Sequence, residues 1–222
     1  MHLHLHCIYH IMIIMARYST EHKGRTRARI LAASDRLLKE RGAQATSIDA
    51  VMRDAGLTVG GFYSHFESKD DLERETLLYG LEASMDRLLA PLAEITDDRA
   101  WVRALIHAYL HQVDEPDLAR ACPLTLLLPE VTRGGPAFQA AFSERTAALL
   151  HRVAHRFPSA AGMSPREVAI AVFASCAGAV AFARTIPAPH ARERVLNATE
   201  TMLVAALDLD DRRGDASAFE GH

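Results

Sequence analysis

The stretch "AGLTVGGFYSHFESKDDL", residues 55–72, decides the fold. Two adjacent glycines, Gly60 and Gly61, stand where a short helix is expected to start, and three aromatic rings follow at residues 62, 63 and 66. Glycine inside a helix costs about 1 kcal/mol relative to alanine. That cost is tolerated where a ligand must approach the main-chain N–H groups at a helix start, because only glycine leaves room there.

Two further short helices are expected before this stretch. Apolar residues recur on one face of residues 26–41, and Gly42 is expected to end that helix. Thr46 and Ser47 then offer N-cap oxygens for a second helix, which stops at Gly56. Three helices in under fifty residues, with only a short turn between the second and the third, form the pattern of a helix-turn-helix domain.

The side chains of the third helix divide between two faces. Phe62 and Phe66 are four residues apart, so they share a face and are expected to pack inward. Tyr63 and His65 are then exposed and can reach phosphate oxygens. Lys69 adds a cation at the start of the next helix, whose N-terminus is itself positive.

Residues 29–72, "RILAASDRLLKERGAQATSIDAVMRDAGLTVGGFYSHFESKDDL", resemble the N-terminal DNA-binding domain of the TetR family of one-component transcriptional regulators. The matching features are the Ala-rich first helix ending at Gly42, the Thr46-Ser47 pair, the Ala55-Gly56-Leu57-Thr58 turn, the Phe62-Tyr63 and His65-Phe66 doublets, and Ser68-Lys69 followed by Leu72. One difference is Val59, where many relatives carry a larger or cationic residue.

The resemblance implies a set of DNA contacts. The residues expected to contact phosphates are Ser47, Tyr63, His65 and Lys69, those expected nearest the bases are Val59, Gly60 and Gly61, and Thr58 is a further expected DNA-binding residue. Val59 and Gly61 cannot make bidentate hydrogen bonds to bases, so the expected base contact is Val59 against a thymine methyl group. For His65, a place at the edge of the core is the alternative.

The composition of the 222-residue chain favours an all-α protein, because Ala, Leu, Arg and Glu are abundant and strand-forming residues are sparse. The net charge of −3 is unevenly distributed. Residues 17–70 hold ten Lys or Arg and seven Asp or Glu, a net of +3, while residues 71–222 hold 15 and 21, a net of −6. A basic N-terminal part on an acidic body indicates a module that binds a polyanion.

Four segments are expected: a disordered or spurious leader at 1–15, the helix-turn-helix domain at 16–70, a helical effector-binding and dimerisation domain at 71–209, and a flexible tail at 210–222. The leader "MHLHLHCIYHIMIIM" has no Lys or Arg to begin a secretory signal. Three scattered cysteines form no disulfide framework. No apolar run approaches the length of about 20 residues that spans a bilayer, so we expect a cytoplasmic protein without membrane contact.

In the TetR family the helices of the second domain enclose a ligand cavity, so bulky apolar residues there are pocket candidates. These candidates are Met85, Trp101, Tyr109, Cys122, Leu126, Phe138, Phe142 and Phe173. The alternative for each of them is a core residue, because pocket lining and ordinary packing use the same residue types. Cys122 could also be a thiol sensor or an inert buried cysteine.

The resemblance also implies a homodimer joined through the last two long helices. The helix around Ser175 is lined with small side chains, which allow another helix to approach closely. The interface candidates are Val168, Val172, Ser175, Ala179, Phe182, Val195 and Met202. A buried core helix is the alternative.

Two histidine pairs, His107 with His111 and His151 with His155, lie four residues apart on expected helices, and each pair could bind a metal ion from one face. The sequence positions no third ligand beside either pair, so we expect no metal site and no cofactor. The chain also lacks a Gly-x-Ser-x-Gly elbow, a phosphate-binding glycine loop and a His-Glu-x-x-His helix, so we expect no enzyme.

The expected function is repression of transcription from a palindromic operator, relieved by a small, largely apolar ligand. Two alternatives remain open: an activator of the same fold, and a metal- or redox-responsive regulator that uses His107 and His111 or Cys122.

Overall fold

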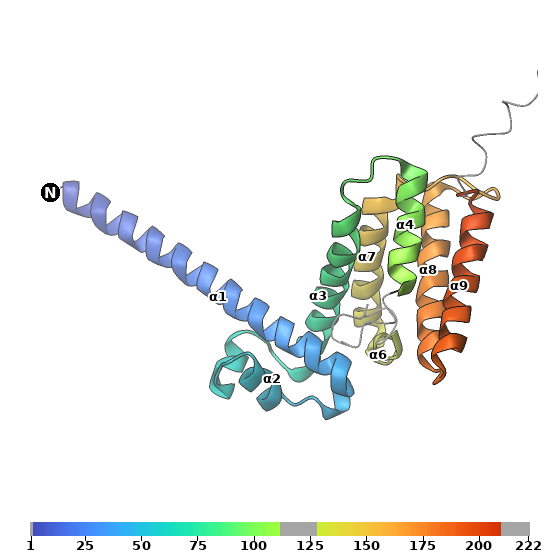
Figure 1. The fold of residues 1–222 in the computed structure, drawn as a ribbon. Helices are drawn as coiled ribbons and strands as arrows, with labels where there is room; N and C mark the ends of the chain where they lie inside the picture. Colours follow the sequence, from blue (N-terminus) through green and yellow to red (C-terminus); the bar gives the residue numbers. More distant parts are fainter. Residues whose placement is uncertain (1, 112–127, 210–222) are drawn as a thin grey trace, which may run out of the picture. The chain divides into compact units, whose positions relative to one another are not determined.

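The computed structural model describes residues 2–111 and 128–209, with side chains from residue 21 onward (Figure 1). In these ranges the chain forms helices joined by turns, and no strand occurs, which confirms the all-α prediction. The elements are α1 (His2–Ala45), α2 (Ile48–Asp54), η1 (Val59–Ser64), α3 (Lys69–Leu89), η2 (Ala90–Leu92), α4 (Asp98–Leu110), α6 (Leu128–Arg133), α7 (Gly135–Ala154), α8 (Pro165–Arg184) and α9 (Pro189–Ala206).

The chain divides into two compact units, residues 1–80 and 81–222. The division falls within α3, ten residues after the expected boundary at residue 70. The helix α3 therefore contributes residues to both units.

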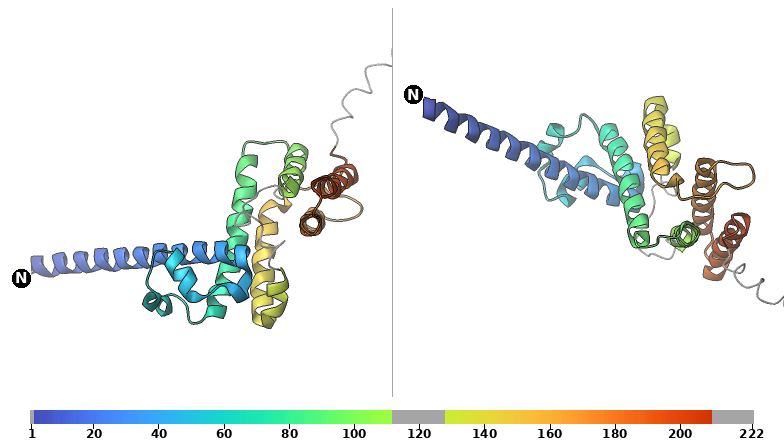
Figure 2. Two further views of the ribbon diagram at one scale, coloured as in Figure 1. Left: turned by 60° about the horizontal axis from the view of Figure 1, so that its bottom comes forward. Right: turned by 90° about the horizontal axis from the view of Figure 1, so that it is seen from above.

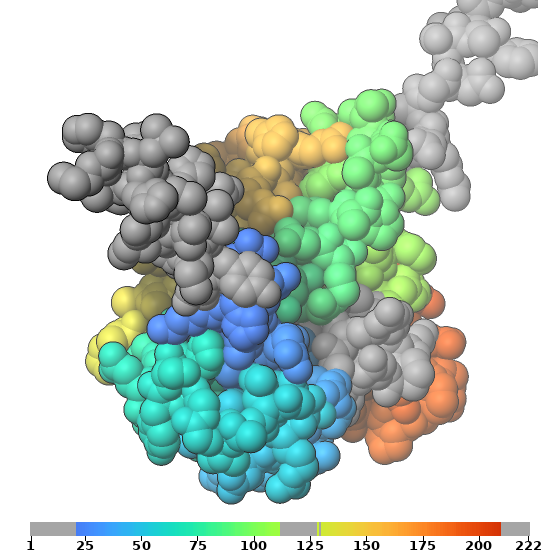
Figure 3. Space-filling model, turned by 90° about the vertical axis from the view of Figure 1, so that its left-hand side faces the viewer, coloured from blue at the N-terminus to red at the C-terminus, as the bar shows by residue number. Residues whose placement is uncertain are grey.

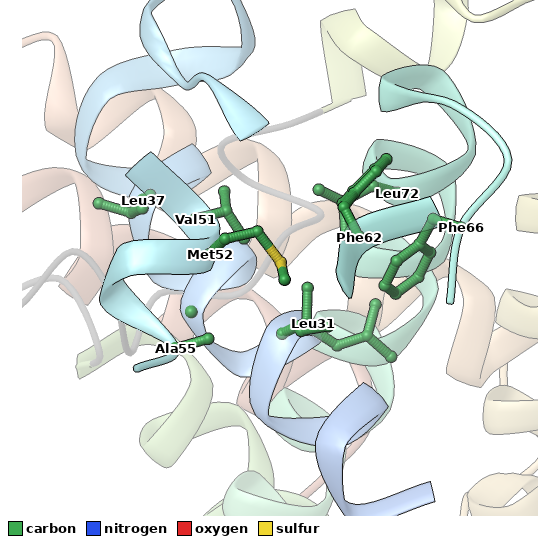
Figure 4. Packing of buried hydrophobic residues seen from close by; sticks show 10 residues of the cluster. Leu31, Leu37, Val51, Met52, Ala55, Phe62, Phe66 and Leu72 are labelled. Atoms are coloured by element: carbon green, nitrogen blue, oxygen red, sulfur yellow. The ribbon is translucent and has the colours of Figure 1, made fainter. Parts of the chain in front are cut away.

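The first unit has its own hydrophobic core, drawn from α1, α2, η1 and the start of α3 (Figure 4). Its fully or nearly buried members are Ile30, Leu31, Ala33, Leu37, Val51, Met52, Ala55, Phe62, Phe66 and Leu72. The rings of Phe62 and Phe66 stack with their centroids 5.7 Å apart. Burial of one such side chain contributes about 1.5–3 kcal/mol, so this small core is enough to hold three short helices together.

The helix α1 is interrupted at Gly42, which has φ 77°. The Thr46 hydroxyl donates a hydrogen bond of 2.8 Å to the Gly42 carbonyl, and the Ser47 hydroxyl accepts one of 3.1 Å from the amide of Ala50. Ser47 is therefore the N-cap of α2, and Thr46 closes the preceding turn. The backbone of α1 is helical from His2, whereas the sequence predicted a helix that begins at residue 26.

In the second unit, α8 packs beside α7 and α9, and α4 lies against both α8 and α9 (Figure 2). Ser164 and Glu167 form a capping box at the start of α8, and Pro165 occupies the first turn as its fixed φ favours. The rings of Trp101 and Phe157 meet edge to face at 6.2 Å, and those of Tyr109 and Phe173 do so at 5.8 Å. The ring centroids of Phe157 and Phe173 are also 6.5 Å apart, so these four aromatic residues pack against one another.

Among the described helices, α8 alone has the length and composition of a membrane-crossing segment, so the expectation that no apolar run approaches that length was wrong. The core helix of a globular domain meets the same criteria. Because Val168, Ala169 and Val172 are at most 2% exposed and α8 contacts α4, α7 and α9, we assign α8 to the core of the second unit.

Candidate nucleic-acid interface

The turn before η1 is built around Gly56, which has φ +67°. The amide of Leu57 donates to the carbonyl of Met52 at 2.8 Å, so the turn closes back on α2. A Cβ on Gly56 would lie 3.1 Å from the Arg29 guanidinium. Positive φ and restricted space both explain the glycine at this turn.

The recognition segment η1 is a 3-10 helix of six residues rather than the expected α-helix. Thr58 precedes it with extended backbone angles, as an N-cap residue does, but its hydroxyl makes no capping hydrogen bond. Instead, the Thr58 carbonyl accepts a hydrogen bond of 3.1 Å from the Gly61 amide. The tighter i→i+3 bonding suits a short segment that contains two glycines.

The inner face of η1 is anchored by aromatic residues, as the sequence analysis predicted. Phe62 is fully buried and Phe66 is 2% exposed. The guanidinium of Arg27 lies over the Phe66 ring, 4.7 Å from its centroid, and adds a cation–π contact. The anchored rings fix the orientation of the opposite, outer face.

The outer face of η1 carries the residues expected to meet DNA (Figure 3). Tyr63 is 72% exposed and Val59 is 42% exposed. A Cβ on Gly60 would meet no atom within 4 Å, and one on Gly61 would meet only the Met52 methyl at 3.8 Å. Val59, Gly60 and Tyr63 are therefore exposed, Gly61 is half-buried, and a phosphate or base edge can approach the backbone at Gly60.

Ser47 and Lys69 have structural roles in addition to their predicted phosphate contacts. Ser47 is exposed but already caps α2. The Lys69 ammonium donates to the carbonyl of Ala43 at 2.8 Å and lies 3.3 Å from the Glu73 carboxylate. Lys69 thus joins the start of α3 to the end of α1, and its charge is partly compensated.

His65 lies at the edge of the core, half-buried. Its Nδ1 is buried and has no hydrogen-bond partner among the residues that the structure describes. Partial burial lowers the pKa of His65 below its usual 6.5, and the positive charges of Lys23 and Arg27 lower it further. His65 is therefore neutral at pH 7, and as a phosphate contact it would offer a single N–H donor without charge.

Several basic residues that the sequence analysis only counted have distinct places in the structure. Arg27 pairs with Glu75 at 3.2 Å, and Arg29 donates to the carbonyl of Ala55 at 2.6 Å. These two arginines attach α1 to α3 and to the end of α2. Lys23 is exposed and close enough to His65 to affect its pKa, which makes it a further phosphate candidate. No local sequence pattern indicated this proximity.

The pocket candidates of the second unit are buried. Met85, Trp101, Tyr109, Phe138, Phe142 and Phe173 are each at most 8% exposed, while Cys122 and Leu126 lie outside the described residues. Burial fits both a ligand cavity and ordinary packing, so their role stays a prediction. Cys176 is also buried, which raises the pKa of its thiol to about 12 with a smaller contribution from the charge of Glu200. This thiol stays protonated at neutral pH and is unsuited to redox sensing.

The interface candidates of α8 and α9 separate into two groups. Val168, Val172 and Ala179 are at most 9% exposed and belong to the core of their own unit, so we remove them from the proposed dimer face. Phe182 and Met202 are 60% and 56% exposed, and Ser175 and Val195 are half-buried. The outward stripe of α8 is formed by residues four apart, namely Ile170, Ala174, Gly178 and Phe182. A shallow groove along α9 includes Val195 and Met202.

Comparison with known proteins agrees with this architecture. Residues 30–76 match the family described as "Bacterial regulatory proteins, tetR family". The chain is 27% identical over 99 residues to the uncharacterized HTH-type transcriptional regulator YfiR of Bacillus subtilis (strain 168), covering 45% of this chain and 46% of YfiR. It is 30% identical over 95 residues to the HTH-type transcriptional repressor KstR2 of Rhodococcus jostii (strain RHA1), covering 43% and 47%. The matches thus span less than half the length of these curated relatives.

The fold itself is shared over most of the chain. The reduced form of E. coli NemR superposes with a TM-score of 0.66 at 20% identity, covering 82% of this chain and 98% of NemR. The matching N-terminal segment, its curated relatives and the shared all-helical architecture lead to one conclusion. Residues 30–76 are a DNA-binding segment of the TetR family of bacterial regulatory proteins, and the chain shares the all-helical fold of that family's solved regulators.

Proposed function

We propose that the chain binds a palindromic DNA operator as a homodimer and represses transcription until a small, largely apolar ligand releases it. The observation that carries this proposal is the open outer face of η1, where Tyr63 is 72% exposed above a fully buried Phe62. The anchored ring presents the neighbouring phenol to solvent in a fixed direction, where its hydroxyl can bond a phosphate oxygen.

Twofold assembly follows from how such a segment reads DNA. Two recognition segments must be held about 34–36 Å apart, or a multiple of it, to enter successive major grooves. The exposed stripe Ile170, Ala174, Gly178 and Phe182 supports α8 as the dimer face, because its small central residues let a second helix approach closely.

Ligand release requires that the ligand bind the two conformations with unequal affinity. We place the ligand among the buried aromatic residues of the second unit. The helix α3 supplies Leu72 to the core of the first unit and Met85 to that of the second, so we propose it as the coupling element. The similarity to KstR2, which is named a transcriptional repressor, supports the role as a repressor. No contact within the described residues bears on that role.

The test begins with selection of binding sites from random duplex DNA by the full-length protein. Fluorescence anisotropy then measures affinity for the selected site and for a scrambled duplex. We expect a clear preference for a palindromic site and a large loss of affinity in Tyr63→Ala, but no loss in His155→Ala, an exposed change at the C-cap of α7. Equal binding of both duplexes, or an unaffected Tyr63→Ala protein, would contradict DNA reading by η1.

Reporter transcription with and without the gene separates a repressor from an activator. Increased transcription from the selected site in the absence of the gene supports repression. Compounds are then screened for release of the purified protein from that site, and release by apolar compounds alone supports the proposed ligand class.

A further inference from the structure

Three side chains that can bind a metal ion lie close together in the second unit. The sequence alone predicted only His107 and His111 to be neighbours. His107 lies in the last turn of α4, His111 is the C-cap residue that follows this helix, and Glu200 comes from α9, 93 residues after His107. Their potential ligand atoms all lie within 4.8 Å of one another. The Nδ1 of His107 is 3.1 Å from one Glu200 carboxylate oxygen, and the Nε2 of His111 is 3.4 Å from the other.

The two nitrogen-to-oxygen distances are close to the separation between ligands of a tetrahedral metal ion. With metal–ligand distances of about 2.0–2.1 Å, neighbouring ligand atoms of a tetrahedral zinc site lie about 3.3 Å apart. The two imidazole rings are already close, with their centroids 4.1 Å apart. All three side chains are thus within reach of one common ion.

Buried residues lie next to each of these ligands, with His107 and Glu200 inside α4 and α9 and His111 at the C-cap of α4. Ile106 and Leu110, next to the two histidines, are completely buried. On α9, Leu196 and Leu203 flank Glu200 by one turn on either side and are 1% and 6% exposed. Ligands on rigid, packed elements are preorganised, so little further ordering opposes metal binding.

We propose that His107, His111 and Glu200 form a binding site for a divalent transition-metal ion of the Zn²⁺ type. Two imidazoles and one carboxylate are a donor set that zinc takes with a fourth position left for water. Imidazole ligands also disfavour Mg²⁺, which prefers oxygen. The side chain of His107 is 60% exposed and that of His111 is 35% exposed, which gives the ion an entry path from solvent.

The competing explanation is a hydrogen-bonded cluster in which Glu200 accepts a bond from each ring and no metal is involved. Metal binding differs from this cluster because it links α4 to α9 through ligands that meet only in the folded chain. An ion that binds the folded state alone raises the unfolding temperature. At a hundredfold excess over its Kd, the expected rise for a chain of this size is about 5 °C or more.

The chain offers an internal control. His151 in the last turn of α7 and His155, the C-cap residue of α7, have the same spacing of four residues, and both are exposed. In the part of the chain that the structure describes, no third metal-binding side chain joins that pair. The histidines of residues 2–10 are retained in every variant, so metal bound there is common to all proteins compared.

The experiment uses full-length protein stripped of metal with EDTA and dialysed. Thermal unfolding is followed with added Zn²⁺ or Mg²⁺, and Zn²⁺ affinity is measured by competition with a chelator. We expect Zn²⁺ but not Mg²⁺ to raise the Tm of wild type, His151→Ala and His155→Ala. We expect Glu200→Gln, His107→Ala and His111→Ala to lose most of this rise and to bind Zn²⁺ about tenfold or more weakly at this site.

Glu200→His separates ligation from packing, because it replaces one metal ligand by another. We expect this variant to keep a Zn²⁺-dependent rise in Tm that Glu200→Gln lacks. Unfolding of each variant in EDTA shows that it folds before zinc is added. Absence of a Zn²⁺-dependent rise in wild type, or an equal rise in Glu200→Gln, would show a hydrogen-bonded cluster only and overturn the proposal. None of these readouts depends on DNA binding, so the result stands apart from the proposed function.

Discussion

The guanidinium of Arg29 in α1 donates a hydrogen bond of 2.6 Å to the carbonyl of Ala55, the last residue before the turn into η1. It thereby fixes the turn that presents the recognition segment. Arg29 also lies next to Gly56, whose missing side chain leaves room for it.

Loss of this bond should destabilise the first unit. Arg29→Met keeps most of the aliphatic stem and removes the donor, so the expected loss is about 1–3 kcal/mol in the free energy of unfolding. Urea denaturation measures it, with Arg53→Met, an exposed change on α2, as the control. Equal stability of the Arg29 variant and the control would show that the bond contributes nothing.

A side chain at Gly56 should also be unfavourable. Gly56→Ala places a Cβ at φ +67° and 3.1 Å from the Arg29 guanidinium. The left-handed conformation alone costs about 1–2 kcal/mol for a residue with a Cβ. Gly60→Ala is the matched control, because its Cβ would meet no atom within 4 Å. Gly60→Ala should unfold at nearly the same urea concentration as wild type but bind DNA more weakly. A destabilised Gly60→Ala protein, or a Gly56→Ala protein as stable as wild type, would contradict the roles assigned to the two glycines.

Lys69 and Tyr63 should differ in their effect on the salt dependence of DNA binding. Lys69→Met removes a cation, so the slope of log K against log salt should fall by about 0.9. Tyr63→Phe removes only a hydroxyl, so it should weaken binding to all sequences alike and leave the slope unchanged. Anisotropy titrations at several salt concentrations measure both. Losses that differ between operator sequences would argue against phosphate contacts.

Protonation of His65 should destabilise the first unit. Its folded-state pKa is lowered below 6.5 by burial and by Lys23 and Arg27, so the unfolded chain binds the proton more tightly. The contribution of neutral His65 to the free energy of unfolding is fully present above pH 6.5, the unfolded-state pKa. It is lost as the pH falls through the lower pKa of the folded state. Urea denaturation between pH 7.5 and 5, chosen to bracket about pH 6.5, should show a smaller loss in His65→Gln than in wild type. An identical loss in both proteins would exclude His65 as the cause.

A charge on the exposed stripe of α8 should separate the subunits. Phe182 is 60% exposed, so Phe182→Glu should fold normally and sediment as a monomer. DNA affinity should fall steeply because one recognition segment then binds alone. Ala148→Glu, an exposed change on α7, serves as the control and should stay dimeric. A dimeric Phe182→Glu protein would place the interface elsewhere.

The sequence predicted those features of the fold that depend on a few neighbouring residues. Gly42 and Gly56 end helices at positive φ, and the spacing of Phe62 and Phe66 predicted their shared burial. The 3-10 form of η1 could not be predicted, because both helix types satisfy the same short pattern.

Features that depend on the packing of distant elements were missed. Apolar residues occur on every side of α8, so periodicity could not separate buried Val172 from exposed Ile170. The approach of Glu200 to His107 joins residues 93 positions apart, and no local pattern contains it.

The burial of Cys176 makes this residue a native probe of how often the second unit opens. The thiol is 1% exposed, so an alkylating reagent reaches it only when the surrounding helices part. In a variant that carries Cys7→Ser and Cys122→Ser, Cys176 is the remaining cysteine. Its alkylation rate would report how often the second unit opens. A ligand or ion that holds the helices together would then be detected by the slower labelling of a native residue, without an engineered probe.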